Sequence, residues 1–167
     1  MAFDLHVRKL DKETYEKIKI YGYRLILVDE ISGTFDGRPK IIIRKKIGND
    51  AKTAKKPKPI LHVPITNFEA AIGLIKRYPN RVRCVEVDLK ELREEADKAL
   101  AFKNLERFSN WLSKRKIPLL FSSGAESVED VVTPMVLFEM VRLVYPKVRM
   151  AKHYRSFYKF LEGLEHG

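Results

Sequence analysis

The stretch RLILVDE, residues 24 to 30, is the feature that most constrains the fold. Its apolar residues follow one another without alternation, which is typical of a strand buried on both faces and therefore of a parallel sheet. Parallel strands need long crossover connections, usually helices. Short β-rich runs do alternate with segments of helical periodicity along the rest of the chain. The pattern predicts an α/β fold of mostly parallel strands with flanking helices.

Six strands and five helices are expected from this alternation. The strands are predicted at residues 3–7, 24–30, 40–47, 60–65, 84–89 and 117–124. Helices are predicted over 12–21, 67–78 and 93–115, followed by two within 127–162 that Pro146 separates. Asn67 is a suitable N-cap, and Pro134 suits a first helical turn. Repeated β-α units suit a barrel or an open parallel sheet, although six strands are too few for a full eight-fold barrel.

The chain of 167 residues is expected to form one domain, residues 1–167. The single cysteine, Cys84, has Val82, Val85 and Val87 as neighbours and is predicted to be a buried strand residue. No apolar run is long enough to span a bilayer, and the N-terminus lacks the pattern of a signal peptide, so a cytoplasmic protein without a membrane partner is expected. Charged residues make up 33% of the chain and glutamine is absent, which suggests a thermophilic source.

The formal net charge of +11 favours a polyanionic partner such as a nucleic acid. Two basic runs carry most of the excess, one around a predicted exposed loop at 48–59 and one in a predicted basic C-terminal helix at 147–164. Solvated lysine-rich loops, common in thermophilic proteins, are the alternative explanation. The candidate nucleic-acid-binding residues are Lys45, Lys46, Lys52, Lys55, Lys56 and Lys58 in the first run, and Lys152, Arg155 and Lys159 in the second.

Lys114, Arg115 and Lys116 form a third basic group and could also bind RNA. Basic residues at a helix C-terminus also interact favourably with the helix dipole, which would explain this group without a ligand. In the last helix, Met150, Tyr154 and Phe157 share one side. At this spacing the aromatic residues are interpreted as core rather than as a stacking surface for nucleobases.

The opening FDLHVRKL raises the question of a metal-dependent phosphoesterase. An Asp-x-His-x-His opening would hold a divalent metal, but Arg8 occupies the position of the second histidine. His62 lies in an apolar strand and is interpreted as a core histidine, while Asp4 and Asp88 are possible ligands in principle. The chain has neither a Gly-x-Ser-x-Gly elbow nor a glycine-rich phosphate loop. We therefore assign no catalytic residue and no protein-bound metal or cofactor.

Four segments follow one another along the chain: FDLHV at the start, VEVDLKEL, the predicted helix and strand KNLERFSNWLSKRKIPLLFSSGAES, and EDVVTP before a predicted helix. In this order they resemble the protein component 3 family of archaeal and eukaryotic ribonuclease P. Within them, Ser122, Ser123, Gly124 and Ala125 match the strand-end motif of the family. The chain resembles a shortened member, because it is shorter than the family around residues 60 to 85. It also has Val132 where relatives carry a basic residue.

The resemblance implies both a fold and a function. The fold is a truncated or distorted TIM-barrel-like domain of the metallophosphoesterase-like type. The function is a non-catalytic RNA-binding subunit of ribonuclease P, in which the RNA removes the 5′ leader of precursor tRNA with bound Mg²⁺. The implied partners are ribonuclease P RNA, precursor tRNA through the complex, and a small protein subunit. The alternatives are a metal-dependent phosphoesterase, which predicts a metal bound near Asp4, His6 and His62, and a general RNA-binding scaffold.

Overall fold

The computed structural model describes residues 2–167, and all seven strands in this range pair in parallel. The first sheet has the order β1-β2-β3 and contains β1 (Phe3–Leu10), β2 (Leu25–Ile31) and β3 (Lys40–Ile43). The second has the order β4-β5-β6-β7 and contains β4 (Gly48–Asp50), β5 (Ile60–His62), β6 (Cys84–Asp88) and β7 (Leu119–Ser122). Spatial order therefore follows chain order in both sheets.

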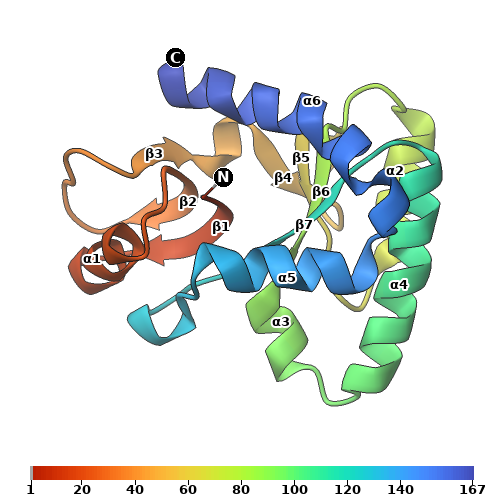
Figure 1. Ribbon diagram of the computed structural model, residues 1–167, viewed down its shortest axis with the longest axis horizontal. Helices are drawn as coiled ribbons and strands as arrows, with labels where there is room; N and C mark the ends of the chain where they lie inside the picture. The colour runs from red at the N-terminus through yellow and green to blue at the C-terminus, as the bar shows by residue number, and fades with distance from the viewer. Residues whose placement is uncertain (1) are drawn as a thin grey trace.

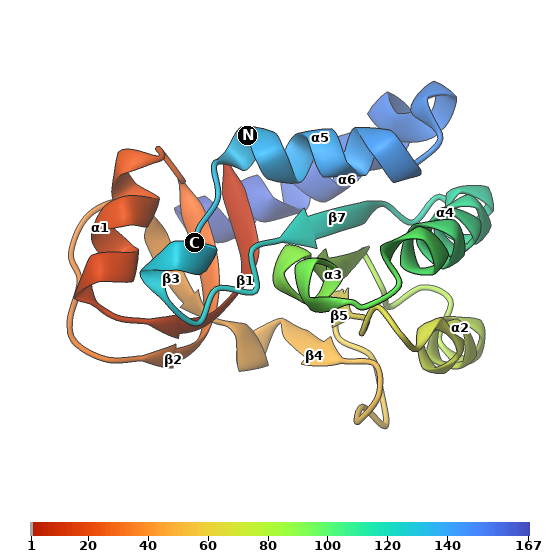
Figure 2. The same cartoon turned by 90° about the horizontal axis from the view of Figure 1, so that it is seen from below.

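Helices flank the strands on several sides (Figures 1 and 2). They are α1 (Lys12–Ile20), α2 (Phe68–Arg77), α3 (Leu89–Glu94), α4 (Lys98–Lys114), α5 (Pro134–Val144) and α6 (Lys147–His166). Two short 3₁₀ turns, η1 (Arg44–Lys46) and η2 (Val128–Asp130), complete the fold. In Figure 2, α5 and α6 lie on one side of the strands, and the loop between β4 and β5 projects from the other side.

Backbone hydrogen bonds join β1 of the first sheet to the segment that follows β7 of the second. Val7 of β1 forms a parallel bridge with Ala125, just beyond β7. Gly124 donates its backbone N–H to the carbonyl of His6 at 2.9 Å, and Arg8 donates to the carbonyl of Ala125 at 2.8 Å. Elsewhere, η1 makes the chain connection from β3 in the first sheet to β4 in the second. The N-terminal strand therefore lies beside the last strand in the sequence.

Period-two alternation in the strands builds two apolar clusters. Leu25 and Leu27 of β2 pack with Phe157 and Leu161 of α6, in a cluster that also includes Leu5, Ile60 and Cys84. The intervening residues Ile26 and Val28 face the opposite way and join the larger core under the other helices. On β6, Cys84, Glu86 and Asp88 share one face, so this face is apolar near α6 and becomes polar toward the carboxyl end of the strand.

Several predictions are confirmed. The fold is α/β with parallel strands and flanking helices. Asn67 caps α2 by accepting a hydrogen bond from the backbone of Ala70, Pro134 begins α5, and Cys84 is buried in β6. The aromatic residues of α6 pack inward as expected, with Tyr154 and Phe157 buried. No helix within residues 2–167 has both the length and the apolarity to cross a bilayer.

Other predictions are wrong in their boundaries. The strand predicted over 40–47 ends at Ile43, because the chain turns through η1 and carries Arg44 inward. The segment 48–59 is not entirely loop, since Gly48–Asp50 pairs with β5 as a seventh strand and Ala51 is buried. The helix predicted over 93–115 is two helices, because Asp97 caps α4 and a break separates it from α3.

The packing of α6 against the strands gives a stability prediction. Phe157 is 1% exposed in the cluster with Leu5 and Leu25. Phe157→Ala should lower the free energy of unfolding by about 3–5 kcal/mol, because it leaves a cavity where α6 covers the strands. Val148→Ala is the control on the same helix, since Val148 is 97% exposed, and it should change stability by less than about 0.5 kcal/mol. Urea unfolding measures both, and equal effects would contradict this account of the core.

Candidate functional site

Four buried side chains from three strands converge at the carboxyl ends of the strands. His6, His62, Glu86 and Asp88 each offer one ligand-type atom, and these atoms lie within 4.8 Å of one another. The two imidazole rings are edge to face, with centroids 5.0 Å apart. Carboxyl ends of parallel strands are where α/β folds commonly place binding sites. This group, the strand-end cluster, is the candidate functional site.

Strand geometry places these side chains together. Glu86 and Asp88 alternate along β6 and therefore project from the same face, and His62 is aligned with Glu86 in the register of β5 with β6. On β1 the pairing register with β2 shifts between Asp4 and Val7. His6, within this irregular stretch, turns toward the β6 carboxylates.

Each histidine is hydrogen-bonded to two carboxylates. His6 Nδ1 lies 2.8 Å from Asp88 Oδ1, and His6 Nε2 lies 2.8 Å from Asp29 Oδ2. His62 Nδ1 lies 2.9 Å from Glu86 Oε1, and its Nε2 lies 3.1 Å from Glu91 Oε1. His62 is thus buried and hydrogen-bonded, as a core histidine would be, but its partners are acids that reach it from β6 and α3.

Two arginines share the same carboxylates. Arg8 donates to Asp88 Oδ2 from Nη2 at 2.7 Å and from Nε at 3.0 Å, and Nη2 also donates to Glu91 at 2.7 Å. Arg44, which is 4% exposed, donates to Glu86 and to the carbonyl of Leu5. Guanidinium groups are fixed cations that bind carboxylates in forked geometry. Both β6 carboxylates of the strand-end cluster are therefore ion-paired within the protein.

These contacts shift the pKa values of the cluster. Burial opposes the charged form of His6, but the carboxylates of Glu86, Asp29 and Asp88 outweigh it and raise the His6 pKa to about 9. Burial likewise opposes the charged form of His62, yet Glu86 and Glu91 raise its pKa to about 11. Burial would raise the pKa of Glu86, but Arg44 and the two histidines lower it well below its usual range. The strand-end cluster is therefore a network of mutually stabilised charges.

An open cavity of about 710 Å³ lies above the strand-end cluster. Its walls carry more acidic than basic side chains, although the chain as a whole has a net charge of +11. The acids that line it are Asp29, Glu30, Asp50, Glu91 and Glu126, beside Arg8, Lys9 and the two histidines. Two imidazoles with several carboxylates form a ligand set suited to a divalent transition metal such as Zn²⁺ or Mn²⁺.

Asp4 lies outside the candidate ligand group. Its Oδ1 accepts hydrogen bonds from the backbone N–H groups of His6 at 3.2 Å and Ser123 at 3.1 Å. Complete burial raises its pKa to about 6, although the hydrogen bonds from Ser123 and His6 act in the opposite direction. Asp4 therefore joins β1 to the segment after β7 rather than facing the cavity.

The motif Ser122–Ala125 connects the strand-end cluster to β1. The Ser122 hydroxyl lies within hydrogen-bonding distance of both carboxylates, 2.8 Å from Asp88 and close to Glu86, and its single proton can be donated to either. Gly124 has a φ of +65°, and a Cβ at this position would lie 2.8 Å from the Asp88 carboxyl group. Ala125 forms the bridge to Val7. The motif thus has a structural role beside the cluster. Glycine is suited to position 124 because the backbone there is left-handed and the Asp88 carboxyl group leaves no room for a Cβ.

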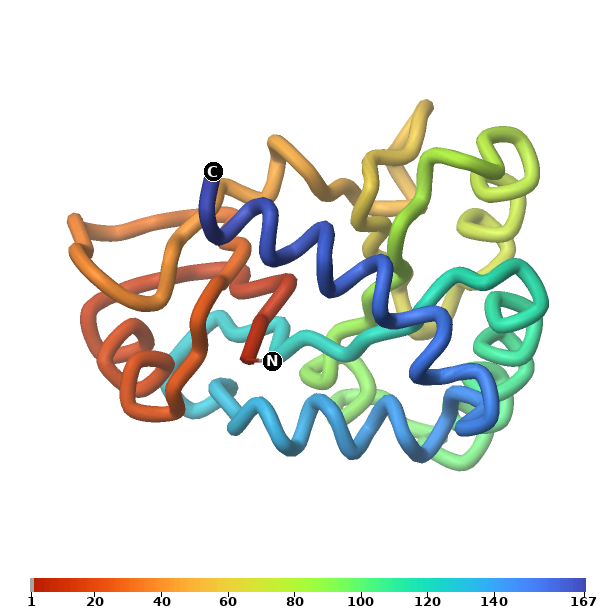
Figure 3. The backbone as a smooth tube through the Cα atoms, turned by 45° about the horizontal axis from the view of Figure 1, so that its top comes forward, coloured from red at the N-terminus to blue at the C-terminus, as the bar shows by residue number. Residues whose placement is uncertain are grey.

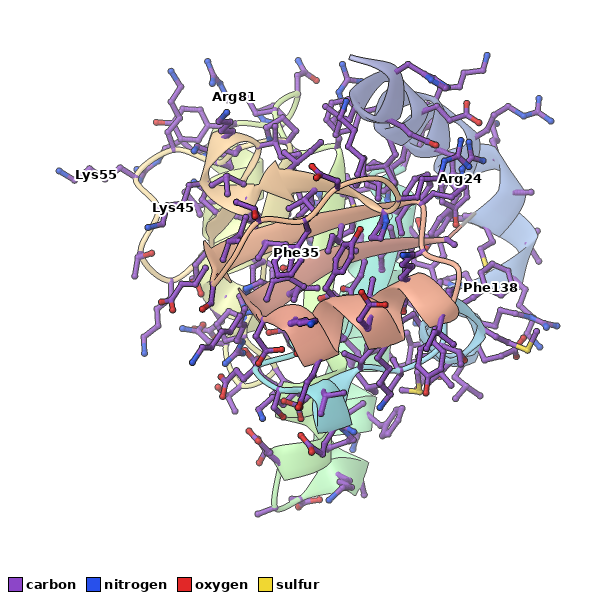
Figure 4. All side chains as sticks on the ribbon, turned by 90° about the vertical axis from the view of Figure 1, so that its left-hand side faces the viewer. Arg24, Phe35, Lys45, Lys55, Arg81 and Phe138 are labelled. Carbon is purple, nitrogen blue, oxygen red and sulfur yellow. The ribbon has the colours of Figure 1, made fainter. Side chains whose placement is uncertain are left out.

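The predicted RNA-binding residues lie away from the strand-end cluster. Ten of the eleven are exposed and Lys58 is half-buried. Lys45 and Lys46 belong to η1, and the next four lysines lie in or beside the β4–β5 loop. Asn49 secures this loop by donating to the carbonyl of Lys56 at 2.8 Å and accepting from the N–H of Lys58 at 3.0 Å. Figure 4 shows Lys45 and Lys55 projecting on the same side of the molecule.

The remaining basic candidates occupy two other places. Lys114 ends α4, and Arg115 lies over the Trp111 ring, with its guanidinium carbon 3.6 Å from the ring centroid. Lys152, Arg155 and Lys159 are exposed on α6. The structure therefore does not bring the basic runs into one patch.

Sequence reasoning missed the convergence of the strand-end cluster. Glu86 and Arg44 were not among the predicted site residues, and His6 and His62 were placed together, with Asp4, only in the phosphoesterase alternative. One signal was present in the sequence: His62 and Asp88 both end short apolar strands. Adjacent parallel strands bring such ends together, so a shared site could have been predicted.

No protein-family model and no curated protein sequence matches the chain. The likeness to the ribonuclease P family therefore depends on the ordered motifs alone.

The close approach at Gly124 gives a second prediction. Gly124→Ala should lower the free energy of unfolding by about 1–3 kcal/mol, because the side chain would strain the backbone and displace Asp88. Gly73→Ala in α2 is the matched control. Nothing lies within 4 Å of a Cβ at Gly73, and removing a helical glycine should stabilise the protein by about 0.5–1 kcal/mol. Chemical denaturation measures the free energy of unfolding of both variants, which should fall for Gly124→Ala and rise for Gly73→Ala.

Proposed function

We propose that the chain is a non-catalytic RNA-binding subunit of ribonuclease P that supports the catalytic RNA in removing the 5′ leader of precursor tRNA. The family resemblance suggests this role. The observation that carries the non-catalytic part is the pairing of Arg8 and Arg44 with Asp88 and Glu86. The two guanidinium groups already occupy carboxylate oxygens that a metal would need as ligands. The strand-end cluster is therefore better suited to stabilising the fold than to binding a metal.

The exposed lysines around the β4–β5 loop support the RNA-binding part. Lysine side chains that project into solvent can neutralise the phosphates of packed RNA helices, and A-form helices offer shape and 2′-hydroxyls more than readable base edges. We expect little sequence preference. The proposed partners are ribonuclease P RNA, precursor tRNA through the complex and a small protein subunit, in the cytoplasm. Mg²⁺ would then be bound by the RNA.

We further propose that the two sheets form one distorted barrel. The strand order follows the chain in both sheets, and the Val7–Ala125 bridge lies between β1 and the end of β7. Side chains from both sheets meet in the strand-end cluster, and α6 packs on the apolar part of the same strand face. These features suit a barrel that is polar at the carboxyl ends of its strands and is covered by a helix at the opposite end.

Reconstitution tests the proposed function. Ribonuclease P RNA and the other protein subunits from the same organism are assayed for precursor-tRNA cleavage at limiting Mg²⁺, with and without this chain. The wild-type chain should increase the rate. A variant with Lys52, Lys55 and Lys56 changed to Gln should lose most of this gain, and the salt slope of its RNA affinity should fall by about 2–3.

The matched control replaces three exposed lysines outside the predicted sites, Lys12, Lys19 and Lys103, with Gln. It removes the same charge, so equal losses in both variants would indicate attraction by net charge alone. A wild-type chain that gives no gain beside an active reconstituted enzyme refutes the proposed role. Similar affinities and salt slopes for unrelated RNAs would favour a general RNA-binding scaffold instead.

A metal-dependent phosphoesterase is the second candidate, and the geometry of His6, His62, Glu86 and Asp88 favours it. A two-histidine, two-carboxylate group can hold a metal that activates water. The two candidates differ at Arg8. If Arg8 blocks the site, Arg8→His should strengthen Zn²⁺ or Mn²⁺ binding at least tenfold, because it frees Asp88 and adds a third imidazole.

Isothermal titration calorimetry of metal into both proteins checks this prediction. Arg24→His, at an arginine that pairs with Glu165, controls for an added histidine elsewhere. Wild-type protein that already binds Mn²⁺ tightly and hydrolyses a phosphodiester, with the activity lost in His62→Ala, would support the phosphoesterase instead.

A further inference from the structure

An apolar groove lies between α5 and α6. The two helices diverge from the turn at Tyr145 and Pro146, as Figure 3 shows, and a cavity of about 860 Å³ lies along them. Phe138, Met150 and Tyr158 contribute apolar side chains to its lining. The strands lie behind the helices, so this groove is separate from the strand-end cluster and shares none of its residues.

Exposed apolar side chains concentrate on the segment that includes α5 and the start of α6, and one of them, Phe138, lines this groove. Eight large hydrophobic residues are exposed in the described part of the chain, and five of them lie between residues 135 and 148. Solvent-exposed apolar residues are ordinary when scattered, but an apolar groove with an exposed aromatic residue in its lining commonly marks an interaction surface. The five are Met135 at 71%, Val136 at 41%, Phe138 at 43%, Leu143 at 69% and Val148 at 97% exposed.

The rim of the groove is basic. Arg142, Lys147, Arg155 and Lys159 line it, against the single acid Glu162. Arg142 pairs with Glu139 on its own helix at 2.9 Å. Within residues 2–167, none of the other three cations forms an ion pair. The groove therefore combines an apolar floor with uncompensated positive charge at its edges.

We propose that this groove binds an acidic amphipathic helix of another protein. A helix laid into an apolar groove through its own apolar face is a common mode of recognition. The stretch of α6 from Lys147 to Glu162 is about 22 Å long at 1.5 Å per residue, which matches a helix of about fifteen residues. Acidic residues beside its apolar face would lie against the four cations of the rim, and this complementarity would also orient the partner.

The chemistry of the surface argues against RNA as the occupant. Nucleobases stack on exposed ring faces. Of the three aromatic rings that line the groove, Tyr154 is only 3% exposed and Tyr158 is half-buried, which leaves Phe138 as the one exposed ring. Phosphates would gain nothing from the apolar lining that Met150 and Ala151 contribute. A second copy of the chain is also a poor partner, because each copy carries +11 and the two would repel one another.

The inference changes the role expected for two residues and holds whether or not the chain binds ribonuclease P RNA. Arg155 and Lys159, predicted as RNA contacts, become rim residues of a protein-binding groove. Lys45 and Lys55 project on one side of the molecule in Figure 4, and Phe138 lies on the opposite side. An RNA bound at the β4–β5 loop would therefore leave the groove free.

Fluorescence anisotropy with a designed peptide tests the proposal. The probe is a labelled helical peptide of about fifteen residues, with Leu and Phe along one face and Glu along its borders. At physiological ionic strength the full chain should bind it, and replacing the apolar residues of the peptide with Ser should abolish binding. Arg155→Glu with Lys159→Glu should weaken binding at least tenfold, and a peptide with Lys in place of Glu should recover affinity for this variant.

The matched control is Arg149→Glu with Lys152→Glu. It makes the same charge change at exposed positions of the same helix that do not line the groove, and it should retain wild-type affinity. Equal losses in both variants overturn the proposal, as does an apolar-face peptide that binds no better than its Ser version. Binding of an oligouridine probe that is lost only in Arg155→Glu with Lys159→Glu, or dimerisation of the chain through this face in sedimentation velocity, would also overturn it.

Discussion

Glu86 is completely buried, and the arrangement of the two sheets depends on how its charge is compensated. A buried carboxylate without partners would cost several kcal/mol. Arg44, His62 and Ser122 supply these partners from η1, β5 and β7. Arg44 also donates to the carbonyl of Leu5 in β1, so one guanidinium joins the first sheet to the second. The strand-end cluster therefore acts as a polar cross-link that adds to the backbone bridge between Val7 and Ala125.

The same network limits the chemistry that the cluster can perform. A metal would have to compete with Arg8 at Asp88 and with Arg44 at Glu86. Removing one member of a buried ionic group leaves the remaining charges unpaired. Single substitutions in such a network are therefore tolerated less well than in an apolar core. The arginines thus give stability and geometry to side chains that resemble a ligand set. This is the physical reason to place the proposed function on the outer surface rather than in the cavity.

Much of the fold was predictable from local pattern, and much of the site was not. RLILVDE predicted a buried parallel strand, Asn67 and Pro134 predicted helix starts, and Cys84 predicted a buried position. KIIIRKKI resembled one continuous strand because nothing local indicates that Arg44 turns inward. Its partner Glu86 is 42 residues away. A strand of three residues such as β4 carries no usable periodicity. Tertiary pairing decided each of these cases.

Charged side chains gather in three separate regions: the acidic cavity above the strand-end cluster, the basic β4–β5 loop, and the basic rim of the α5–α6 groove. Their separation constrains how ligands could approach. Phosphates would be repelled by the acidic cavity beside Asp50, yet Asp50 directly precedes the lysine-bearing β4–β5 loop. RNA would therefore meet this loop from outside and avoid the strand ends. The α5–α6 groove has basic edges as well, but its apolar floor favours a partner that brings both carboxylates and hydrophobic side chains. A chain with a net charge of +11 would in this way distinguish a nucleic acid from a protein. The distinction would come from the polar or apolar side chains beside the cations rather than from the positive charge itself.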